Sequence, residues 1–380
     1  MTSAQAFLSA VRERRADFEA AARRAEDERT LPADVVGLMR DLRLFWLKTP
    51  RELGGSELDA LEFCDVLEEI AYYDASAAWT AMVGNGCTGT VAGWLPEEGL
   101  REVFAGPDLP ICAGQFVARG RAARVDGGYA VTGRWAFSSG INHSGWLVGG
   151  CRVAGGGEPI LVVVPKSEAT CHDTWHVAGL QGTGSGDYSL EEVFVPAART
   201  FAWPSPAVRG GDLFAQAPVL FVSNELGPVV VGIARRAIDD MYAMAGATDR
   251  RLNRASVGER AAFHKDIARA EARVRAASLL YRDSVAESLT AAKAGEEPGP
   301  SFVPRMLAQH TLVVEECADV VVQLIRYGGG RVLALSHPLQ RHLRNLLAAR
   351  QHVYVSEENY ELAGRTRLDE LSRPESSPAP

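Results

Sequence analysis

The chain has 380 residues, of which 47% are hydrophobic and 23% are charged, with a formal net charge of −8. This composition is ordinary for a globular protein with more than one subdomain and unlike that of a disordered or fibrous chain. The negative charge and the lack of a dense Lys/Arg stripe argue against a surface that binds nucleic acid.

The N-terminal segment 1–28 is charged and amphipathic, without the apolar stretch of a signal peptide, and no apolar run reaches membrane-spanning length. The six cysteines are scattered without a C-x-x-C pair, which is typical of reduced thiols. No histidine pair has the spacing and neighbouring carboxylate of a zinc site, so no metal is expected. We therefore expect a cytoplasmic protein without membrane association.

Residues 1–108 are predicted to form an N-terminal helical domain. Apolar residues recur with helical spacing over 4–28, again after Pro32, and again over 58–73. The stretch Asp74-Ala-Ser-Ala-Ala-Trp79 is rich in small residues that permit close helix packing.

The period changes in residues 109–212, where short β-like runs alternate with glycines. The runs cover 111–117, 122–125, 129–137, 145–151, 159–164 and 188–195. Asp126-Gly127-Gly128 between two runs predicts a hairpin, because the turns that match strand twist need positive φ angles. We expect this region to form a central β-barrel domain.

Residues 213–371 return to long helical periodicity. The four segments cover 220–245, 259–294, 304–327 and 338–363. They predict a C-terminal four-helix bundle, followed by a disordered Pro/Ser-rich tail over 372–380. The predicted fold class is α+β.

Four motifs lie within this order of domains. They are Gly133-Arg-Trp-Ala-Phe-Ser-Ser-Gly140, Trp175-His-Val-Ala-Gly-Leu-Gln-Gly-Thr-Gly-Ser185, Val193-Phe-Val-Pro196 and Pro338-Leu-Gln-Arg341. Together they resemble the acyl-CoA dehydrogenase superfamily over nearly the whole chain. The first motif, and the helix that leads from the last motif to a histidine, are similar to the hydroxylase components of two-component flavin-dependent monooxygenases.

This resemblance implies an acyl-CoA dehydrogenase-like fold that uses reduced FAD or FMN, O2 and a small-molecule substrate. A separate NAD(P)H:flavin reductase would supply the reduced flavin, and the chain would assemble as a homotetramer. The implied reaction is hydroxylation or N-oxygenation of a small aromatic, polyketide or amino-sugar metabolite through a C4a-hydroperoxyflavin.

His352 is the strongest candidate for a catalytic residue. It follows Arg344 at about the distance at which acyl-CoA dehydrogenases place the glutamate of a Glu-Gly-Thr sequence, which is missing here. The resemblance pairs this imidazole with Ser139 or Ser138. A group that titrates near neutrality, together with a hydroxyl, suits the protonation and retention of a peroxide. On spacing alone, a core histidine is the more common interpretation.

A flavin ring needs an apolar wall and hydrogen bonds at its pyrimidine edge. Strand alternation would place Trp135 and Phe137 on one face, with the serines where the strand ends. The alternative is that both rings fill the interior of the barrel. The resemblance also implies flavin contacts from the segment that contains Gly114 and Gln115, and from Trp175.

Some further candidate flavin contacts each have two interpretations. Thr183 and Ser185 lie in a glycine-dense stretch that is either a phosphate cradle or a tight turn. Arg341 is a candidate for a flavin phosphate or a surface ion pair. The resemblance places Gln323 and Gly329 near the flavin of a neighbouring subunit.

The expected substrate pocket departs from the pattern of phenol hydroxylases. Many of these carry a further histidine on the helix after the Ser-x-Ala-Trp motif, whereas residues 82–90 here contain none. Asn85, Cys87 or Thr88 is expected to line the pocket instead, and His143 to orient substrate or flavin. Simple phenol ortho-hydroxylation is therefore in doubt.

Two other functions stay open. One is an acyl-CoA dehydrogenase-type FAD-dependent desaturase, which would need a carboxylate base. The other is a non-catalytic flavin-fold binding protein that has lost its chemistry.

Overall fold

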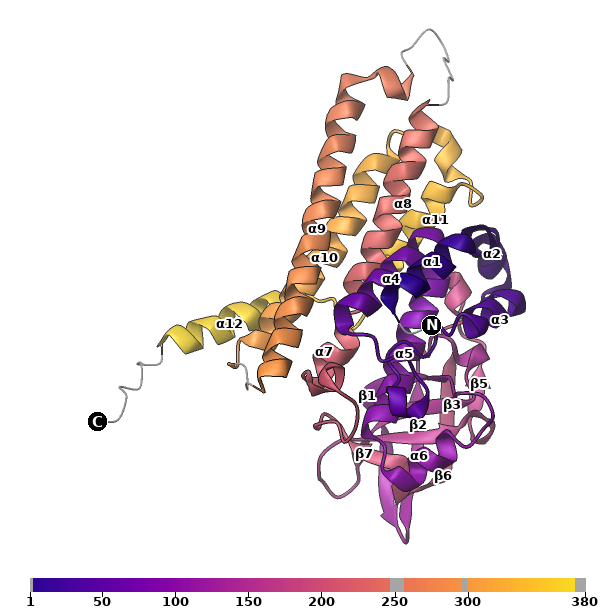
Figure 1. Cartoon of the computed structure of the whole chain (residues 1–380), viewed down its shortest axis with the longest axis vertical. Coiled ribbons are helices and arrows are strands. Elements are labelled where there is room, and N and C mark those ends of the chain that lie inside the picture. The colour runs from indigo at the N-terminus through magenta and orange to yellow at the C-terminus, as the bar shows by residue number, and fades with distance from the viewer. Residues whose placement is uncertain (1–2, 247–255, 296–298, 373–380) are drawn as a thin grey trace.

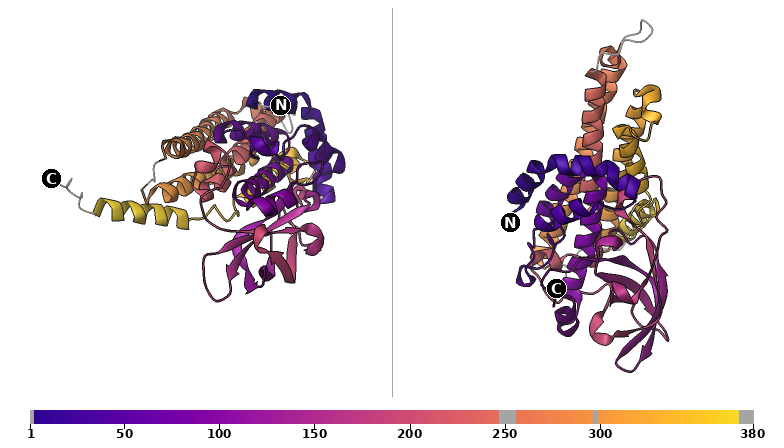
Figure 2. Two further views of the ribbon diagram at one scale, coloured as in Figure 1. Left: turned by 60° about the horizontal axis from the view of Figure 1, so that its bottom comes forward. Right: turned by 90° about the vertical axis from the view of Figure 1, so that its right-hand side faces the viewer.

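Figure 1 shows a computed structural model of the chain, which describes residues 3–246, 256–295 and 299–372. N-terminal helices, a central sheet and C-terminal helices follow one another along the sequence. In both Figure 1 and Figure 2 the long C-terminal helices extend away from the sheet, and the N-terminal helices lie between the two. Residues 373–380 of the predicted tail lie outside the described residues.

The N-terminal helices begin at side chains that cap them. The helices are α1 (Ala4–Glu13), α2 (Arg15–Glu28), α3 (Ala33–Asp41), α4 (Ala60–Tyr73), α5 (Ala75–Trp94) and α6 (Glu97–Val103). Asp59 and Glu62 form a capping box at the start of α4, and the Asp74 side chain accepts a hydrogen bond from the Ser76 N–H at the start of α5. The stretch predicted as one helix over 4–28 is divided at Arg14.

The central region is an open seven-stranded sheet in the order β5-β6-β2-β1-β3-β4-β7. The strands are β1 (Cys112–Val125), β2 (Gly128–Trp135), β3 (Trp146–Val153), β4 (Ile160–Pro165), β5 (Thr170–His172), β6 (Asp187–Pro196) and β7 (Thr200–Ala202). The prediction of a barrel is therefore wrong. A barrel closes when its edge strands pair, but β5 pairs with β6 and β7 pairs with β4, and each edge strand has only three residues.

The predicted hairpin is present between β1 and β2. Val125 pairs with Gly128 in antiparallel register, and Gly127 in the turn has φ 76°. The runs predicted over 111–117 and 122–125 form the single strand β1, with a register shift between Gln115 and Gly120. The two edge strands escaped prediction because three residues are too few to show a period.

The C-terminal helices pack side by side, with α10 in contact with α8, α9 and α11. The helices are α7 (Pro218–Ser223), α8 (Leu226–Gly246), α9 (Ala261–Ala294), α10 (Phe302–Ile325), α11 (Pro338–Ala349) and α12 (Glu358–Ser372). The last helix projects to one side, as Figure 1 shows. None of the described helices has the length and apolar character needed to cross a membrane.

The segment predicted as one helix over 338–363 is two helices. The first ends at Ala349 and the second begins at Glu358. β-Branched Val353 and Val355 lie between them, and Ser356 Oγ accepts a hydrogen bond from the Glu358 N–H, which favours a new helix start. His352 therefore lies in the turn after α11 and not within a helix.

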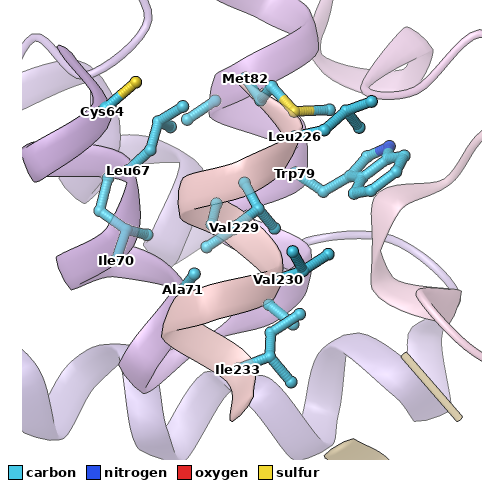
Figure 3. Close-up of a cluster of buried hydrophobic side chains, with 14 of the residues drawn as sticks. Cys64, Leu67, Ile70, Ala71, Trp79, Met82, Leu226, Val229, Val230 and Ile233 are labelled. Carbon is cyan, nitrogen blue, oxygen red and sulfur yellow. The ribbon is translucent and has the colours of Figure 1, made fainter. Parts of the chain in front are cut away.

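The main hydrophobic core joins α4, α5 and α8, whose buried side chains interdigitate in Figure 3. A β-carbon at Gly232 on α8 would lie 2.4 Å from the carbonyl oxygen of Glu68 on α4, so the two helices are in backbone contact. This close packing fixes the first residues of α8 against α5, where a cavity opens.

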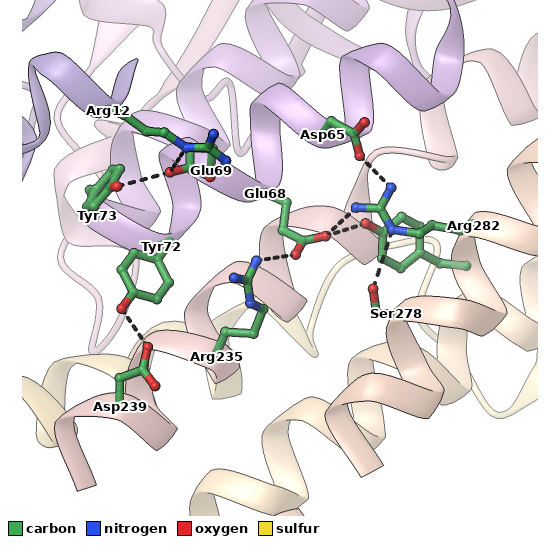
Figure 4. Close-up of polar contacts among 11 residues, drawn as sticks. Arg12, Asp65, Glu68, Glu69, Tyr72, Tyr73, Arg235, Asp239, Ser278 and Arg282 are labelled. Carbon is green, nitrogen blue, oxygen red and sulfur yellow. Dashed lines mark hydrogen bonds and ion pairs between the residues drawn. The ribbon is translucent and has the colours of Figure 1, made fainter. Parts of the chain in front are cut away.

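A polar network links the same helices to α9, as shown in Figure 4. The Glu68 carboxylate accepts hydrogen bonds from Arg235 at 2.6 Å, Arg282 at 2.9 Å and the Tyr281 hydroxyl. Arg282 also bonds to Asp65. Since Glu68 is buried, each partner offsets the unfavourable desolvation of its charge, and the network fixes how α4, α8 and α9 meet.

Candidate active site

A cavity of about 220 Å³ opens between the sheet and the helices. Gly114, Gln115, Phe137, Ser139 and Trp175 line its sheet side. The helical side is lined by Trp79, Met82, Gly86, Cys87, Glu225, His352 and Tyr354, among others. Residues from α5, β1, the loop after β2, the segment just before α8 and the turn after α11 therefore meet around one space.

Gly114 lines the cavity on β1, and its lack of a side chain lets β1 lie close to β3. Its φ of 153° is rarely adopted by residues with a side chain, and a β-carbon there would lie 2.0 Å from the carbonyl oxygen of Val148 on β3. Glycine is therefore required here. The close pairing of β1 and β3 at this point forms part of the cavity wall.

Three hydroxyl groups form a chain of hydrogen bonds at the sheet side, which we call the hydroxyl chain. Ser139 Oγ lies 2.7 Å from Ser185 Oγ, which lies 2.6 Å from Thr183 Oγ1. Thr183 donates to the carbonyl oxygen of Leu180 at 2.7 Å, and the Trp79 Nε1–H donates to Ser139 at 3.2 Å.

Each hydroxyl has a single proton, and this determines which group donates and which accepts at every step of the hydroxyl chain. A hydroxyl has one proton to donate, and Thr183 gives its proton to a carbonyl, so Ser185 must donate to Thr183. Ser139 must then donate to Ser185. Its proton is occupied, so Ser139 can act toward a ligand in the cavity only as an acceptor.

His352 lies against Trp79, with ring centroids 5.5 Å apart and an interplanar angle of 74°. Its Nδ1 accepts a hydrogen bond from the Tyr354 N–H at 3.3 Å, which places the proton of the neutral imidazole on Nε2. Burial by the surrounding protein lowers the pKa of His352 to about 4. This differs from the expectation of a group that titrates near neutrality.

The two predicted catalytic serines have different surroundings. Ser139 lines the cavity with His352, and Trp79 contacts both residues; their pairing in catalysis stays a prediction. Ser138 is buried, does not line the cavity, and its Oγ has no hydrogen-bond partner within the described part of the chain.

Trp135 does not lie in the cavity, contrary to the prediction. It is fully buried beside the sheet, where Nε1 donates to the Gly150 carbonyl oxygen at 2.9 Å and the ring stacks on Tyr188 at 5.0 Å. Phe137 does line the cavity and contacts Trp175 at 6.2 Å between centroids. Strand alternation fails because β2 ends at Trp135 and Phe137 has a φ of 63°.

The remaining predicted flavin contacts divide in two. Ser185 lines the cavity, whereas Thr183 lies behind it as the end of the hydroxyl chain. Gln323 is exposed on α10 and accepts a hydrogen bond from Arg273, and Gly329 is exposed beyond that helix. Arg341 is half-buried on α11 and does not line the cavity. A contact of Gln323 or Gly329 with a second subunit's flavin stays a prediction.

Of the predicted substrate residues on α5, only Cys87 lines the cavity. Trp79, Met82, Gly86 and Cys87 share one face of this helix by their spacing. Asn85 and Thr88 point elsewhere, as the Asn85 amide donates to the Leu44 carbonyl oxygen at 2.7 Å and Thr88 Oγ1 accepts from the Cys112 N–H at 3.0 Å.

His143 also lies outside the cavity, where its Nε2 is 3.2 Å from Thr30 Oγ1. Burial, together with the charges of Lys166 and Arg40, lowers the pKa of His143 to about 4. The histidine instead joins the loop after β2 to the segment between α2 and α3.

Sequence reasoning missed a buried ion pair at the helical side. Glu225, which directly precedes α8, bonds to Lys48, and each residue is at most 3% exposed. Burial raises the pKa of Glu225, and the ammonium of Lys48 opposes this rise. A signal was present, since both residues interrupt apolar runs, in Phe45-Trp-Leu-Lys48 and in Leu220-Phe-Val-Ser-Asn-Glu225.

Comparison with known proteins gives matches to two family models. "Acyl-CoA dehydrogenase, N-terminal domain" matches residues 2–98, and "Acyl-CoA dehydrogenase, C-terminal domain" matches residues 225–357. The chain is 30% identical over 364 residues to the oxygenase component of an FADH(2)-dependent resorcinol hydroxylase from Rhizobium sp. (strain MTP-10005), covering 89% of this chain and 88% of that protein.

Other relatives agree. An indole-3-acetate monooxygenase from Pseudomonas putida is 29% identical over 347 residues, with 89% of this chain and 87% of that protein covered. The solved structure of XiaF from Streptomyces sp. with FADH2 and glycerol superposes with a TM-score of 0.89 at 25% identity, and covers 96% of each chain. The chain therefore belongs to the acyl-CoA dehydrogenase superfamily, in its branch of two-component flavin-dependent monooxygenases.

Proposed function

We propose that the chain is an oxygenase component that receives reduced FAD or FMN from a separate NAD(P)H:flavin reductase and uses O2 to oxygenate a small metabolite. Its relatives are flavin-dependent monooxygenase components that act on aromatic or sugar substrates, which supports this activity over the two alternatives. The substrate class and the roles of individual residues belong to the proposal.

The residues around the cavity fit a flat ring with one apolar and one polar edge. Phe137 and Trp175 supply apolar walls, the hydroxyl chain supplies polar atoms, and Gly114 lines the space without a side chain. These residues and Gln115 would hold the isoalloxazine. When bound, reduced flavin supplies the electrons that activate O2, so that one oxygen atom enters the substrate and the other leaves as water.

The direction of the hydroxyl chain is the observation that carries the preference for reduced flavin. Ser139 can only accept a hydrogen bond from a ligand, because its own proton is committed to Ser185. Reduced isoalloxazine has a ring N–H at its reactive edge, where the oxidised ring has a bare nitrogen. An acceptor therefore suits the reduced form, whereas two facing acceptors would repel each other.

His352 would act as a neutral hydrogen-bond donor. Its Nδ1 is occupied by the Tyr354 N–H and its pKa is about 4, so near pH 7 it offers the proton on Nε2 without carrying a charge. Trp79 fixes the orientation of the imidazole through the edge-on ring contact. The apolar residues around it limit the entry of water, which reduces unproductive loss of peroxide.

The desaturase alternative has less support. Acyl-CoA dehydrogenation requires a carboxylate base for proton abstraction, and the position after α11 carries His352. Glu225 is a carboxylate beside the cavity, but Lys48 is bonded to one of its oxygens.

We also propose a homotetramer in a reducing cytoplasmic environment. No side chain of helix α12 is fully buried among the described residues, and Leu368 and Leu371 on it are 66% exposed. Such leucines are expected to pack against another subunit. The six free cysteines, five of them buried, fit a reducing compartment.

The deciding experiment compares the affinities for reduced and oxidised FAD under anaerobic conditions by equilibrium dialysis, and repeats the comparison with FMN. We expect the reduced form to bind at least tenfold more tightly. Addition of O2 and a substrate should then give product with little hydrogen peroxide. Tight binding of oxidised FAD that an acyl-CoA reduces would support the desaturase, and failure to bind flavin in either state would support the non-catalytic alternative.

A further inference from the structure

The Lys48–Glu225 ion pair is held rigidly from the side away from the cavity. The Lys48 ammonium donates to Glu225 Oε1 and to the Phe221 carbonyl oxygen, and lies over the rings of Phe221 and Phe63 at 3.6 and 5.5 Å from their centroids. The Asn85 amide oxygen accepts a hydrogen bond from the Lys48 backbone N–H at 3.1 Å. These contacts fix the ammonium and, through it, one oxygen of the carboxylate.

The other oxygen of Glu225 lies toward the cavity. A β-carbon at Gly86, which lines the cavity, would lie 3.7 Å from Oε2, so the missing side chain leaves space in front of this oxygen. Glu225 itself lines the cavity, as does Tyr354. The pKa of Tyr354 is raised to about 12, mainly by burial and secondly by the negative charge of Glu225. The carboxylate is thus close to both Gly86 and Tyr354.

The helical side of the cavity is largely apolar. Its lining includes Met82, Val83, Cys87 and Val222. A buried ion pair adds little stability compared with apolar residues of the same size, because desolvation of both charges offsets their attraction. Since the ion pair lies beside a cavity, a role in binding a ligand explains its presence better than a role in stability.

The pair has a defined chemical preference. Lys48 compensates the charge of the carboxylate, so a second cation is not needed, while Oε2 keeps the capacity to accept a hydrogen bond. A hydrogen bond to a charged group is stronger than one between neutral groups. The preferred partner is a neutral N–H or O–H on an otherwise apolar molecule that fills the rest of the cavity.

We propose that Glu225, oriented by Lys48 and exposed by Gly86, is a substrate-binding subsite that accepts a hydrogen bond from a neutral N–H or O–H group of an otherwise apolar substrate. This inference rests on the proposed oxygenase function, since it assigns the substrate end of the same cavity. It supplies an acceptor on the helical wall where residues 82–90 carry no histidine.

The test uses pairs of probes that differ only in the donor. Indole is compared with 1-methylindole, and 2-naphthol with 2-methoxynaphthalene, by anaerobic equilibrium dialysis against the full chain loaded with reduced FAD. In the wild type we expect the donor of at least one pair to bind at least tenfold more tightly than its methylated partner.

Glu225→Gln should reduce this preference to less than threefold. The amide oxygen can still accept from Lys48, which turns the amide N–H₂ toward the cavity, where it faces the donor of the probe. Met82→Leu is the matched control, because it changes an apolar residue of the same helical wall and leaves the ion pair intact. It should keep the preference within twofold of the wild type.

A second variant tests the subsite even if Glu225→Gln fails to fold. Gly86→Ala leaves the ion pair intact, and its β-carbon would be at an ordinary contact distance of 3.7 Å from Oε2. Alanine is also favoured over glycine within a helix. The methyl group covers Oε2, so we expect the preference for the donor probe to fall at least threefold without loss of thermal stability.

The outcomes separate this inference from the proposed function. Equal binding of both members of each pair to the wild type, no binding of any probe, or a preference that survives both Glu225→Gln and Gly86→Ala would overturn the subsite. Binding of reduced FAD is measured in the same dialysis. Its absence would count against the oxygenase function, whereas a lost probe preference with normal flavin binding counts against the subsite alone.

Discussion

The indole of Trp79 meets the imidazole of His352 edge to face, with centroids 5.5 Å apart. The same indole donates its N–H to Ser139 at 3.2 Å, so one side chain of α5 contacts both residues of the predicted catalytic pair. These two residues come from the turn after α11 and the loop after β2, and α5 determines their separation.

Trp79→Phe tests this arrangement. Phenylalanine keeps an aromatic ring against His352 but removes the hydrogen bond to Ser139. Without this bond Ser139 is held less firmly in its position as an acceptor, so we expect the affinity for reduced flavin to fall by at most roughly fivefold, the equivalent of one net hydrogen bond of about 1 kcal/mol. The fraction of consumed O2 released as hydrogen peroxide should also rise. Unchanged affinity and unchanged peroxide release, measured with a peroxide-specific electrode, would contradict a role for the indole N–H.

Thr183→Val tests the direction of the hydroxyl chain. Valine has nearly the same shape but gives Ser185 no oxygen to donate to, so Ser139 is free to donate toward the cavity. We expect oxidised FAD to bind roughly fivefold more tightly relative to reduced FAD, as one hydrogen bond of about 1 kcal/mol becomes available. Titration of both redox forms measures this ratio.

The control for this variant is Ser138→Ala. Its hydroxyl is also buried, but it has no hydrogen-bond partner among the described residues and lies outside the chain of hydroxyls. The ratio of affinities should stay at the wild-type value. A change of the ratio in Ser138→Ala as large as in Thr183→Val would indicate a general packing effect.

His352 should act without changing its charge between pH 6 and pH 8. Its pKa is lowered to about 4 by burial, so the imidazole stays neutral throughout this range. We expect the coupling of O2 consumption to product to lack a transition near pH 6.5. His352→Ala should raise peroxide release strongly, and His352→Gln, which keeps a neutral N–H donor, should restore part of the coupling. Coupling that is lost around pH 6.5 in the wild type alone would contradict a permanently neutral histidine.

The burial of His310 leads us to expect that the free energy of unfolding falls in acid. It is fully buried on α10, neither ring nitrogen has a partner within the described part of the chain, and burial lowers its pKa to about 4. In the unfolded chain this imidazole has the ordinary histidine pKa of 6.5, so the unfolded state gains protons first as the pH falls. This histidine should therefore lower the free energy of unfolding by about 2 kcal/mol between pH 7 and pH 5.

His310→Leu should remove the share of about 2 kcal/mol that comes from this histidine, while His143 and His352, whose pKa values are also lowered to about 4, keep their own shares. Leucine has no proton to gain and suits the apolar surroundings of the helix. Urea unfolding at pH 7 and pH 5 gives the comparison, and His264→Leu is the control because its imidazole bonds to the Gly258 carbonyl oxygen at the surface. An equal effect of pH on the wild type and His310→Leu would show that other groups cause the acid sensitivity.

Much of the candidate site could be predicted because the sequence motifs that indicate it span only a few neighbouring residues. The turn at Asp126-Gly127, the Ser-Ser-Gly loop and the glycine-dense stretch before Ser185 follow from local chemistry that acts over a few residues. Their order along the chain, with the resemblance they carry, placed Ser139, Phe137, Trp175 and His352 together, and the structure brings all four to one cavity.

The errors arise where the outcome depends on distant partners. Trp135 and Phe137 share an alternating pattern, but the strand ends between them, so one fills the space beside the sheet and the other lines the cavity. The barrel failed for a related reason, since its closure would have required two edge strands to pair and the sequence between them does not indicate whether they do.

The sequence by itself determined the order of a helical, a β and a second helical region, the hairpin turn, and the family, because periodicity and turn chemistry are properties of neighbouring residues. Only the tertiary structure decided which oxygen of Glu225 bonds to Lys48 and which lies near Gly86. It also decided that the hydroxyl proton of Ser139 is donated to Ser185. Glu225 meets a lysine 177 residues away, and Ser139 meets a serine 46 residues away. Burial and hydrogen-bond partners of this kind arise when separate segments of the chain pack together.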